Sequence, residues 1–471
     1  MRVYNTLTRS VEPLVPGEPG HVRLYTCGPT VYDFAHIGNF RTYVWEDLLR
    51  RALKYLGFRV TQVMNITDIE DKIIAKAIAS GRSIGDVTEP FIRAFFEDLD
   101  TLAIERAEHY PRATDHIPEM LAIAATLKDK GLTYESQGSL YFRIDAFPGY
   151  GRLSNLEKRE IKVGARVDSD EYDKDDARDF VLWKGHREGE PKWDGPFGPG
   201  RPGWHLECSA MSMKYLGESF DLHTGGVDNI FPHHENEIAQ SEGATGRPFV
   251  RTWMHAAHLM VDGEKMAKSK GNFYTLRDLI ARGHDARALR YLLLTTHYRT
   301  PLNFTFDALA RAAGELERLD AVHARLGEAA AAGDDGFHLE FDARADTIER
   351  EIKDALADDL NVSGATGALF RLVRETNAAL DRGELPGGSV ASLKARLARI
   401  DEVFAVLPRG GEALLDPEVE ALVAQRTAAR KSKNFAESDR IRDLLAARGI
   451  VLEDTPQGVR WRRALAGPLS D

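Results

Sequence analysis

Two cysteines carry the most distinctive chemistry in this sequence. The 471 residues contain only Cys27 and Cys208, and neither belongs to a Cys-x-x-Cys pair. The segment His233-His234-Glu235-Asn236-Glu237 adds imidazole and carboxylate groups. Thiolate, imidazole and carboxylate are the ligand types of tetrahedral zinc sites. If the fold brings these three segments together, the sequence predicts a zinc site. Otherwise the cysteines are two buried apolar thiols.

The choice of histidine in this predicted site stays open at the level of spacing. His233 lies four residues before Glu237 and His234 lies three residues before it. Both separations place the imidazole and the carboxylate on one face of a helix. The predicted ligands are therefore Cys27, Cys208, Glu237 and one of the two histidines.

Two further segments carry groups that suit phosphate. His36-Ile37-Gly38-Asn39 lies between a predicted strand and a predicted helix, and a helix N-terminus offers free N–H groups to an anion. The loop from Lys265 to Asn272, with the sequence KMAKSKGN, can neutralise a polyphosphate through its lysines. Taken separately, these segments also fit a capped turn and a solvated basic loop.

The elements that position these groups alternate between strand and helix patterns. His21 to Cys27 and Arg59 to Ile66 alternate like strands, and the amphipathic run from Arg41 to Gly57 lies between them. This order predicts a parallel sheet with a right-handed crossover. From Tyr134 to Gly203, short strand-like pieces alternate with charged and Gly/Pro-rich loops, which indicates an insertion.

Beyond Phe306 the sequence becomes helical, and three apolar stripes predict a helical bundle. They are Leu316, Leu319, Val322 and Leu326; Ile348, Ile352, Leu356 and Leu360; and Leu393, Leu397, Ile400 and Phe404. Two helices and a hairpin follow a linker at Pro408 to Pro417.

The predicted fold class is α/β, with a Rossmann-type parallel-sheet catalytic domain over residues 1–305. This domain contains an insertion at about 115–203 and the KMAKS loop region at about 258–305. A helical bundle domain at 306–407 and a small α+β C-terminal domain at 417–471 complete the expected organisation.

The HIGN and KMAKS segments together resemble the signature pair of class I aminoacyl-tRNA synthetases, HIGH and KMSKS. Asn39 stands where the family has a second histidine, and Ala267 stands where it has a serine. The resemblance implies that His36, Gly38, Asn39, Lys265, Lys268 and Ser269 bind ATP. It assigns catalysis to His36, Asn39, Lys265 and Lys268, and it implies that Mg²⁺ accompanies ATP.

Four motifs narrow the resemblance to the cysteinyl-tRNA synthetase family. They are CGPTVYD from Cys27, NITDIEDK from Asn65, GWHLECSAM from Gly203 and FPHHENE from Phe231. The resemblance implies one zinc ion on Cys27, Cys208, His233 and Glu237, which selects His233 over His234. It also places Thr67, Trp204, His223 and Asp228 around the bound cysteine.

The implied reaction is the ATP-dependent formation of cysteinyl-adenylate, followed by transfer to the 3′-terminal adenosine of tRNA-Cys through its 2′-hydroxyl. A pocket based on shape separates near-isosteres such as cysteine and serine by only about 1–3 kcal/mol. Zinc favours a thiolate over a hydroxyl, so it can read the one atom that differs. Two thiolates and a carboxylate around Zn²⁺ give the site a formal charge of −1, which should weaken the capture of another anion and predicts that Glu237 is a loosely held ligand.

The C-terminal end has the opposite charge balance to the chain as a whole. The chain has a net charge of −11, whereas Ala421 to Asp471 contains ten Lys and Arg against six Asp and Glu, a net of +4. We expect anticodon recognition here, through phosphate contacts and base stacking. The candidate residues are Arg426, Arg430, Lys431, Lys433, Arg460, Trp461, Arg462 and Arg463.

The bulk composition sets the remaining expectations. The sequence contains no run of about 18 apolar residues, so we expect no membrane span. The first nine residues lack the apolar stretch of a signal peptide. Two cysteines cannot form a disulfide framework, which fits a reducing compartment. We therefore expect a cytoplasmic protein, and a monomer because no long apolar seam is visible. Its expected partners are ATP, L-cysteine and tRNA-Cys.

Two alternative functions are compatible with parts of the sequence. A cysteine ligase of mycothiol biosynthesis resembles the same catalytic half but transfers cysteine to an amino sugar, and it should not need the basic C-terminal module. A non-catalytic, zinc-stabilised RNA-binding protein derived from a synthetase should have lost HIGN or KMAKS, and both are present.

Overall fold

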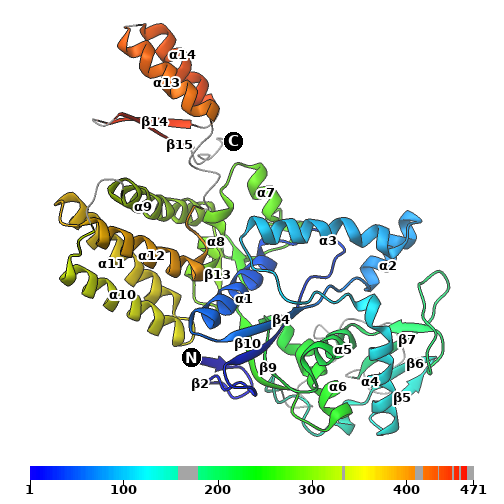
Figure 1. Ribbon diagram of the computed structural model, residues 1–471. Helices are drawn as coiled ribbons and strands as arrows, with labels where there is room; N and C mark the ends of the chain where they lie inside the picture. Colours follow the sequence, from blue (N-terminus) through cyan, green and yellow to red (C-terminus); the bar gives the residue numbers. More distant parts are fainter. Residues whose placement is uncertain are drawn as a thin grey trace.

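A four-stranded parallel sheet forms the centre of the molecule in the computed structural model (Figure 1). The structure describes residues 1–156, 179–330, 335–408, 417–432, 434–447, 450–455 and 458–463. The strand order is β10-β9-β3-β4, with β3 at His21–Thr26, β4 at Arg59–Met64, β9 at Phe220–Gly226 and β10 at Val250–Ala256. All three pairings are parallel, which confirms the predicted α/β fold class.

The sheet contains a topological switch point between β3 and β9. From β3 the chain passes through helix α1 (Ile37–Tyr55) to β4 on one side. From β9 it passes through α6 (Glu235–Thr245) to β10 on the other side. The carboxyl ends of two strands whose connections diverge in this way leave a crevice, where ligands of open α/β sheets bind.

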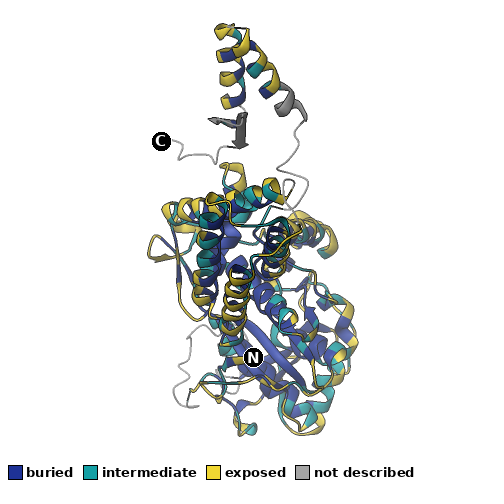
Figure 2. Ribbon diagram, turned by 60° about the vertical axis from the view of Figure 1, so that its left-hand side comes forward, coloured by how far each residue is buried: buried dark blue, intermediate teal, exposed yellow. Residues whose placement is uncertain are grey.

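Two hydrophobic cores cover the two faces of the sheet. Leu24, Met64 and Met254 point into a core shared with α1 and the helical bundle. Tyr25, Val63 and Trp253, one residue away in each strand, point into a second core. This alternation follows from the two-residue period of a strand. Figure 2 shows the buried residues running through the sheet while the outer helix faces are exposed.

Helix α1 begins four residues earlier than the apolar pattern predicts. His36 is the N-cap, and the HIGN residues form the first turn instead of a preceding loop. The side chain of His36 accepts a hydrogen bond from the backbone N–H of Asn39, and the side chain of Asn39 accepts one from the N–H of His36. This reciprocal capping box satisfies two backbone donors that a helix start would otherwise leave unpaired.

The second core lies under the predicted insertion. Helix α4 (Ile117–Asp129) precedes an antiparallel sheet, and α5 (Trp204–Leu216) follows it and returns the chain to β9. This sheet has the order β5-β6-β7-β8 and is separate from the parallel sheet. Its strands are β5 (Thr133–Ser136), β6 (Ser139–Phe142), β7 (Phe180–Gly185) and β8 (Gly200–Pro202).

The remaining elements of the first 305 residues flank the sheet. Helices α2 (Asp71–Ser80) and α3 (Ile84–Thr101) follow β4. Strands β1 (Arg2–Asn5) and β2 (Ser10–Pro13) form an antiparallel pair. A small sheet, β12-β11-β13, carries the KMAKS loop; its strands are β11 (Leu259–Val261), β12 (Glu264–Lys265) and β13 (Leu302–Phe304). Helices α7 (Leu276–Ala281) and α8 (Ala286–Thr295) lie between β12 and β13.

The predicted helical bundle is present as four long helices: α9 (Phe306–Ala330), α10 (Leu339–Ala357), α11 (Val362–Asp381) and α12 (Gly387–Phe404). All twelve residues of the three predicted stripes are buried, which confirms their core role. Leu360 differs from the prediction in one respect. It lies beyond the end of α10, in a turn where its φ is 54°.

The C-terminal module stands apart from the bundle (Figure 1). It consists of α13 (Pro417–Lys431), α14 (Phe435–Ala447) and the antiparallel pair β14 (Ile450–Thr455) and β15 (Gly458–Arg463). Val423, Ile441, Leu445 and Ile450 form its own small core. Among the described residues, no helix is long and apolar enough to cross a membrane.

Candidate active site

The predicted zinc ligands converge at the switch point. Cys27 follows β3, Cys208 lies in α5, and His233 and Glu237 lie just before and within α6. Their ligand atoms all lie within 4.8 Å of one another. Residues that are far apart in sequence thus form one cluster because the parallel sheet aligns the ends of β3 and β9.

A second set, Cys27, His223, His234 and Glu237, meets the same distance criterion. The Nε2 atom of His234 lies 3.2 Å from the Cys27 sulfur, and its Nδ1 lies 2.8 Å from Nε2 of His255. Only the first set includes both thiols. Two thiolates, an imidazole and a carboxylate match the donors that zinc prefers, so we favour the set with His233.

The carboxylate of Glu237 has one oxygen that makes no hydrogen bond among the described residues. Its Oε1 is buried 2.9 Å from Nε2 of His233, but it has no hydrogen-bond partner within the described part of the chain. The contact has the distance of an ion pair without the geometry of a hydrogen bond. A cation held between the two atoms satisfies both, so the residues fit a metal ion.

The electrostatics of the cluster favour ionised ligands. Burial opposes ionisation of Glu237, but His223 and His233 outweigh it and lower its pKa to about 2. The Cys27 thiol donates toward Cys208, which lowers the pKa of Cys208 and raises that of Cys27. One thiolate therefore forms readily, and a bound cation would favour the second.

Outer contacts orient the ligands. His223, predicted to contact the substrate, is fully buried instead and lies with its Nε2 3.0 Å from Oε2 of Glu237. His205 lies 2.8 Å from His233, Nδ1 to Nδ1, and Trp204 stacks on the His233 ring at 4.3 Å. Such contacts fix the ring orientation of a metal-binding histidine.

A cleft of about 520 Å³ runs from the HIGN turn past this cluster. Its lining includes His36, Asn39 and Lys268, together with Trp204 and Asp228. Thr67 lies below the surface, where its hydroxyl donates to Glu207 at 3.1 Å, and Glu207 itself lines the cleft. The cleft therefore joins three of the predicted ATP residues to two of the predicted cysteine residues, with Thr67 and His223 behind its wall.

The HIGN turn and the KMAKS loop touch each other. A Cβ at Gly38 would lie 2.9 Å from Nδ1 of His36 and 3.2 Å from the terminal methyl of Met266. The missing side chain thus makes room for the loop as well as for any nucleotide. Ile37 also donates to the carbonyl of Tyr274 at 3.0 Å. Lys265 and Ser269 are exposed and lie outside the described lining of the cleft.

Lys268 contacts protein side chains in place of the phosphate that it is expected to bind. Its ammonium forms an ion pair with Asp33 of the CGPTVYD motif and lies over the ring of Phe273. The sequence pattern did not identify Asp33 as a partner of the loop, because the two residues are 235 positions apart. The sequence also gave no indication of the hydrogen bonds around the cluster that involve His205, Glu207 and His255, apart from the position of these residues in or near the motifs.

The predicted tRNA-binding residues have different settings. Arg430 and Lys431 are exposed on α13, whereas Arg426 is buried with 7% of its surface exposed. This burial makes Arg426 less accessible to a phosphate than Arg430 and Lys431, and its contact with tRNA stays a prediction. Arg460, Trp461, Arg462 and Arg463 lie on β15, and Lys433 lies outside the described residues.

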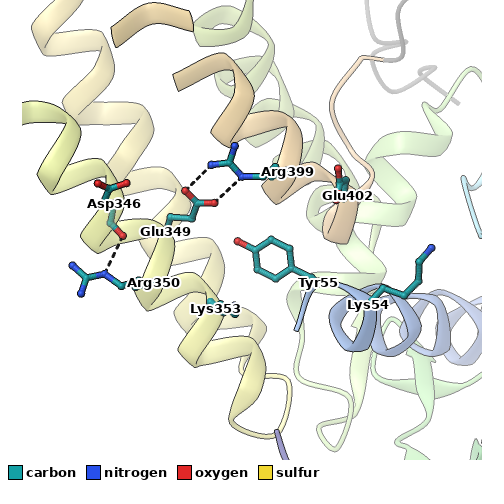
Figure 3. Close-up of a pocket in the computed structure, with 8 residues that line it drawn as sticks. All are labelled: Lys54, Tyr55, Asp346, Glu349, Arg350, Lys353, Arg399 and Glu402. Carbon is teal, nitrogen blue, oxygen red and sulfur yellow. Dashed lines mark hydrogen bonds and ion pairs between the residues drawn. The ribbon is translucent and has the colours of Figure 1, made fainter. Parts of the chain in front are cut away.

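A second cavity, of about 730 Å³, lies between the end of α1 and helices α10 and α12 (Figure 3). It is lined by Lys54, Tyr55, Asp346, Glu349, Arg350, Lys353, Arg399 and Glu402. Several of these charges already pair, as Arg399 does with Glu349 at 3.0 Å. Because α1 spans 19 residues, the cavity is roughly 27 Å from the HIGN turn and is no part of the active site.

Family models match three parts of the chain. Residues 13–314 match the tRNA synthetases class I (C) catalytic domain, residues 351–408 match the DALR domain, and residues 412–462 match the cysteinyl-tRNA ligase anticodon binding domain.

Curated relatives and solved structures agree with these matches. The chain is 51% identical to a cysteine–tRNA ligase of Solibacter usitatus, over 98% of this chain and 99% of that protein. It is 50% identical to one of Leptospira interrogans, with the same coverage. A Mycobacterium tuberculosis methionyl-tRNA synthetase in complex with methionyl-adenylate has a TM-score of 0.60 at 16% identity. That match covers 82% of this chain and 88% of the other.

Proposed function

The chain belongs to the cysteine–tRNA ligase family of class I aminoacyl-tRNA synthetases, and on that premise we propose how its own residues perform the reaction. The protein activates L-cysteine with ATP and transfers it to the 3′-terminal adenosine of tRNA-Cys. The observation that carries this proposal is the cleft that joins the HIGN turn and Lys268 to Trp204, which stacks on His233 of the thiol–imidazole–carboxylate cluster.

In the first step, a carboxylate oxygen of cysteine attacks the α-phosphorus of ATP, and the bond to the pyrophosphate oxygen breaks. His36 and the amide nitrogen of Asn39 contact the phosphates, because the capping bond occupies only the oxygen of Asn39. Lys268 exchanges Asp33 for the departing pyrophosphate, and Lys265 joins it when the loop closes. Positioning and charge stabilisation supply the acceleration. Mg²⁺ accompanies ATP.

In the second step, the 2′-hydroxyl of the terminal ribose attacks the carbonyl carbon of the adenylate, and AMP leaves. The tRNA is held at a distance by the C-terminal module, with Arg430 and Lys431 exposed on α13. Arg460, Trp461 and Arg462 follow on β15. The basic charge of this module supports the tRNA acceptor over the amino sugar of the mycothiol-type alternative.

Selection of cysteine falls to the cluster next to the cleft wall formed by Trp204 and His205. Zinc held by Cys27, Cys208, His233 and Glu237 would supply a ligand position for the substrate sulfur. His223 orients Glu237, and His205 and Trp204 orient His233. Asp228, exposed at the cleft, is available to the substrate ammonium group. Of the four residues that would hold the zinc, we expect Glu237 to be the most loosely bound.

The proposal is tested by two assays on one preparation. Cysteine-dependent ATP–pyrophosphate exchange reports the first step, and charging of tRNA-Cys reports the second. Exchange with charging supports the ligase. Exchange with transfer to glucosaminyl-inositol but not to tRNA would support the mycothiol-type ligase, and no exchange would support the non-catalytic RNA-binding protein.

Three finer expectations complete the proposal. The protein acts as a monomer in the cytoplasm, with one zinc ion per chain. Light scattering coupled to size-exclusion chromatography tests the first expectation, since a dimer doubles the mass of 52.5 kDa. Metal analysis of the purified protein tests the last.

A further inference from the structure

A chain of hydrogen bonds reaches Cys27 from the turn between β1 and β2. The hydroxyl of Thr6 lies 2.7 Å from Nδ1 of His255 on β10. The other ring nitrogen of His255, Nε2, lies 2.8 Å from Nδ1 of His234. Nε2 of His234 lies in turn 3.2 Å from the sulfur of Cys27. The three links therefore connect the N-terminal turn to a predicted metal ligand through two imidazole rings.

Backbone contacts hold both ends of this chain. The N–H of Thr6 donates to the carbonyl of Trp253 at 2.8 Å, and the Asn5 side chain accepts from the N–H of Trp253 at 3.1 Å. These bonds fix the turn against β10. At the other end, a Cβ at Gly225 would lie 2.9 Å from the His234 ring, so the glycine leaves the space that this ring occupies. Only 4% of His255 and none of His234 is exposed.

The protons of the two rings follow from burial. A neutral imidazole has one N–H donor and one acceptor nitrogen, whereas the cation has two donors. Burial lowers the pKa of His255 to about 3. His234 is fully buried beside the rings of His223 and His233, at 4.4 and 5.6 Å, where a positive charge is costly. Both rings are therefore neutral, and each passes on one hydrogen bond and receives one.

A metal-bound Cys27 sets the direction of all three hydrogen bonds. A thiolate sulfur has no hydrogen and can only accept, so Nε2 of His234 must donate to it. Nδ1 of His234 then accepts, which requires the Nε2–H tautomer of His255. Nδ1 of His255 accepts in turn, and its donor is the hydroxyl of Thr6.

This direction has two consequences for the site. A histidine binds a metal only through a nitrogen without a proton, so a proton on Nε2 removes His234 from the second set of candidate ligands. A hydrogen bond to the sulfur also withdraws part of the negative charge that Cys27 donates to the metal. In a site with a formal charge of −1, that favours the approach of a substrate thiolate.

We propose that Thr6, His255 and His234 form a hydrogen-bond relay of one direction, which orients Cys27 and keeps His234 off the metal. Thr6 and His255 are positioning residues, since both lie outside the described lining of the cleft and act only through His234. The proposal rests on the zinc-dependent selection of cysteine proposed above. It gives the turn after β1 a task in the active site.

The test uses isosteric changes at Thr6 in the full-length protein. Thr6→Val removes the hydroxyl and keeps the shape, and Thr6→Ser returns the hydroxyl. Thr8→Val is the matched control, because Thr8 lies in the same turn, is exposed and bonds Ser10 and Glu12, each at 3.0 Å. His255→Leu interrupts the relay one link nearer to the metal.

Two readouts are independent of catalysis. The affinity for zinc is measured by competition with a chromogenic chelator, without ATP or cysteine. NMR of the zinc-loaded parent protein, labelled with ¹⁵N in its histidines, identifies which nitrogen of each ring carries the proton.

The relay predicts that Thr6→Val raises the Kd for zinc by roughly tenfold and His255→Leu by up to about 100-fold. Thr6→Ser and Thr8→Val should stay within about twofold of the parent. The NMR spectra should show Nε2–H tautomers for both His234 and His255.

An unchanged zinc affinity in Thr6→Val, or an equal loss in Thr8→Val, would overturn the proposal. A proton on Nδ1 of His234, or a metal on its Nε2, would also overturn it. If His255→Leu does not fold, the Thr6 variants and the spectra still decide. A parent protein that binds no zinc would instead contradict the proposed selection of cysteine by zinc.

Discussion

Single residues in this molecule carry more than one task, and Gly38 is the clearest case. It belongs to a phosphate-binding turn, and it also leaves the space into which Met266 of the KMAKS loop packs. The sequence indicated the first task from the position of glycine at a helix start. The second depends on a residue 228 positions away and could not be read from local pattern.

Gly38→Ala therefore tests the contact between the two motifs. The new methyl group would lie 2.9 Å from the His36 ring, which is closer than Cβ atoms normally come, and 3.2 Å from the terminal methyl of Met266, which is a tight contact. We expect ATP–pyrophosphate exchange to fall by at least about tenfold, which corresponds to about 1.4 kcal/mol. The melting temperature should change little, because the loop is at the surface. A variant with normal exchange and a normal KM for ATP would show that the loop leaves Gly38 before catalysis.

The helices and strands that position the site explain which of its residues could be predicted from the sequence. Cys27 and His233 meet because they follow parallel strands that end at one edge, and the strand–helix–strand pattern already indicated such a sheet. Cys208 joins them from α5, which packs against β3 and α6. The role of His223 was harder to predict. It lies inside β9, where alternation decides which face it points to, and that face is the buried side next to Glu237. The burial of Arg426 was hard to predict for the same reason, since the inner face of a two-helix module cannot be known before its packing.

The ion pair between Asp33 and Lys268 gives an element-level prediction. Both side chains are partly exposed, at 36% and 65%, so the pair is worth about 0.2–1 kcal/mol. Asp33→Asn should release the KMAKS loop and increase the rate of tryptic cleavage at its lysines by up to about fivefold. Asp33→Glu should restore protection.

ATP provides the second arm of this experiment. If Lys268 exchanges Asp33 for phosphate, saturating ATP should protect the loop equally in the parent and in Asp33→Asn. Equal cleavage of the two proteins without ATP would show that Asp33 does not hold the loop.

At the scale of the whole molecule, the buried guanidinium of Arg290 connects the catalytic sheet domain to the helical bundle. Arg290 of α8 and Asp47 of α1 lie 2.5 Å apart, with side chains 1% and 0% exposed. The guanidinium also donates to the carbonyls of Leu102 and Phe404. It thus fixes the end of α12 against α1. The apolar stripes predicted the bundle, but a pair separated by 243 positions had no signal in one sequence.

Arg290→Met should destabilise the protein by about 3–5 kcal/mol, because it leaves Asp47 and two carbonyls without this partner in a buried site. Urea unfolding measures the change in free energy. Arg51 also pairs with Asp47, at 2.8 Å, so Arg51→Met serves as the control and should cost less. A change below about 1 kcal/mol in Arg290→Met would show that the pair contributes nothing net.

The measurement that tests the central claim most directly is the preference of the enzyme for cysteine over serine in Cys208→Ser, with metal analysis of the same samples. The claim is that thiol recognition depends on a metal held by Cys27, Cys208, His233 and Glu237. We predict one zinc ion per parent chain and none in the variant. The ratio of kcat/KM for cysteine to that for serine in ATP–pyrophosphate exchange should fall to the roughly 10- to 200-fold that shape alone provides. A zinc-free variant that keeps the parent's full preference would contradict the account.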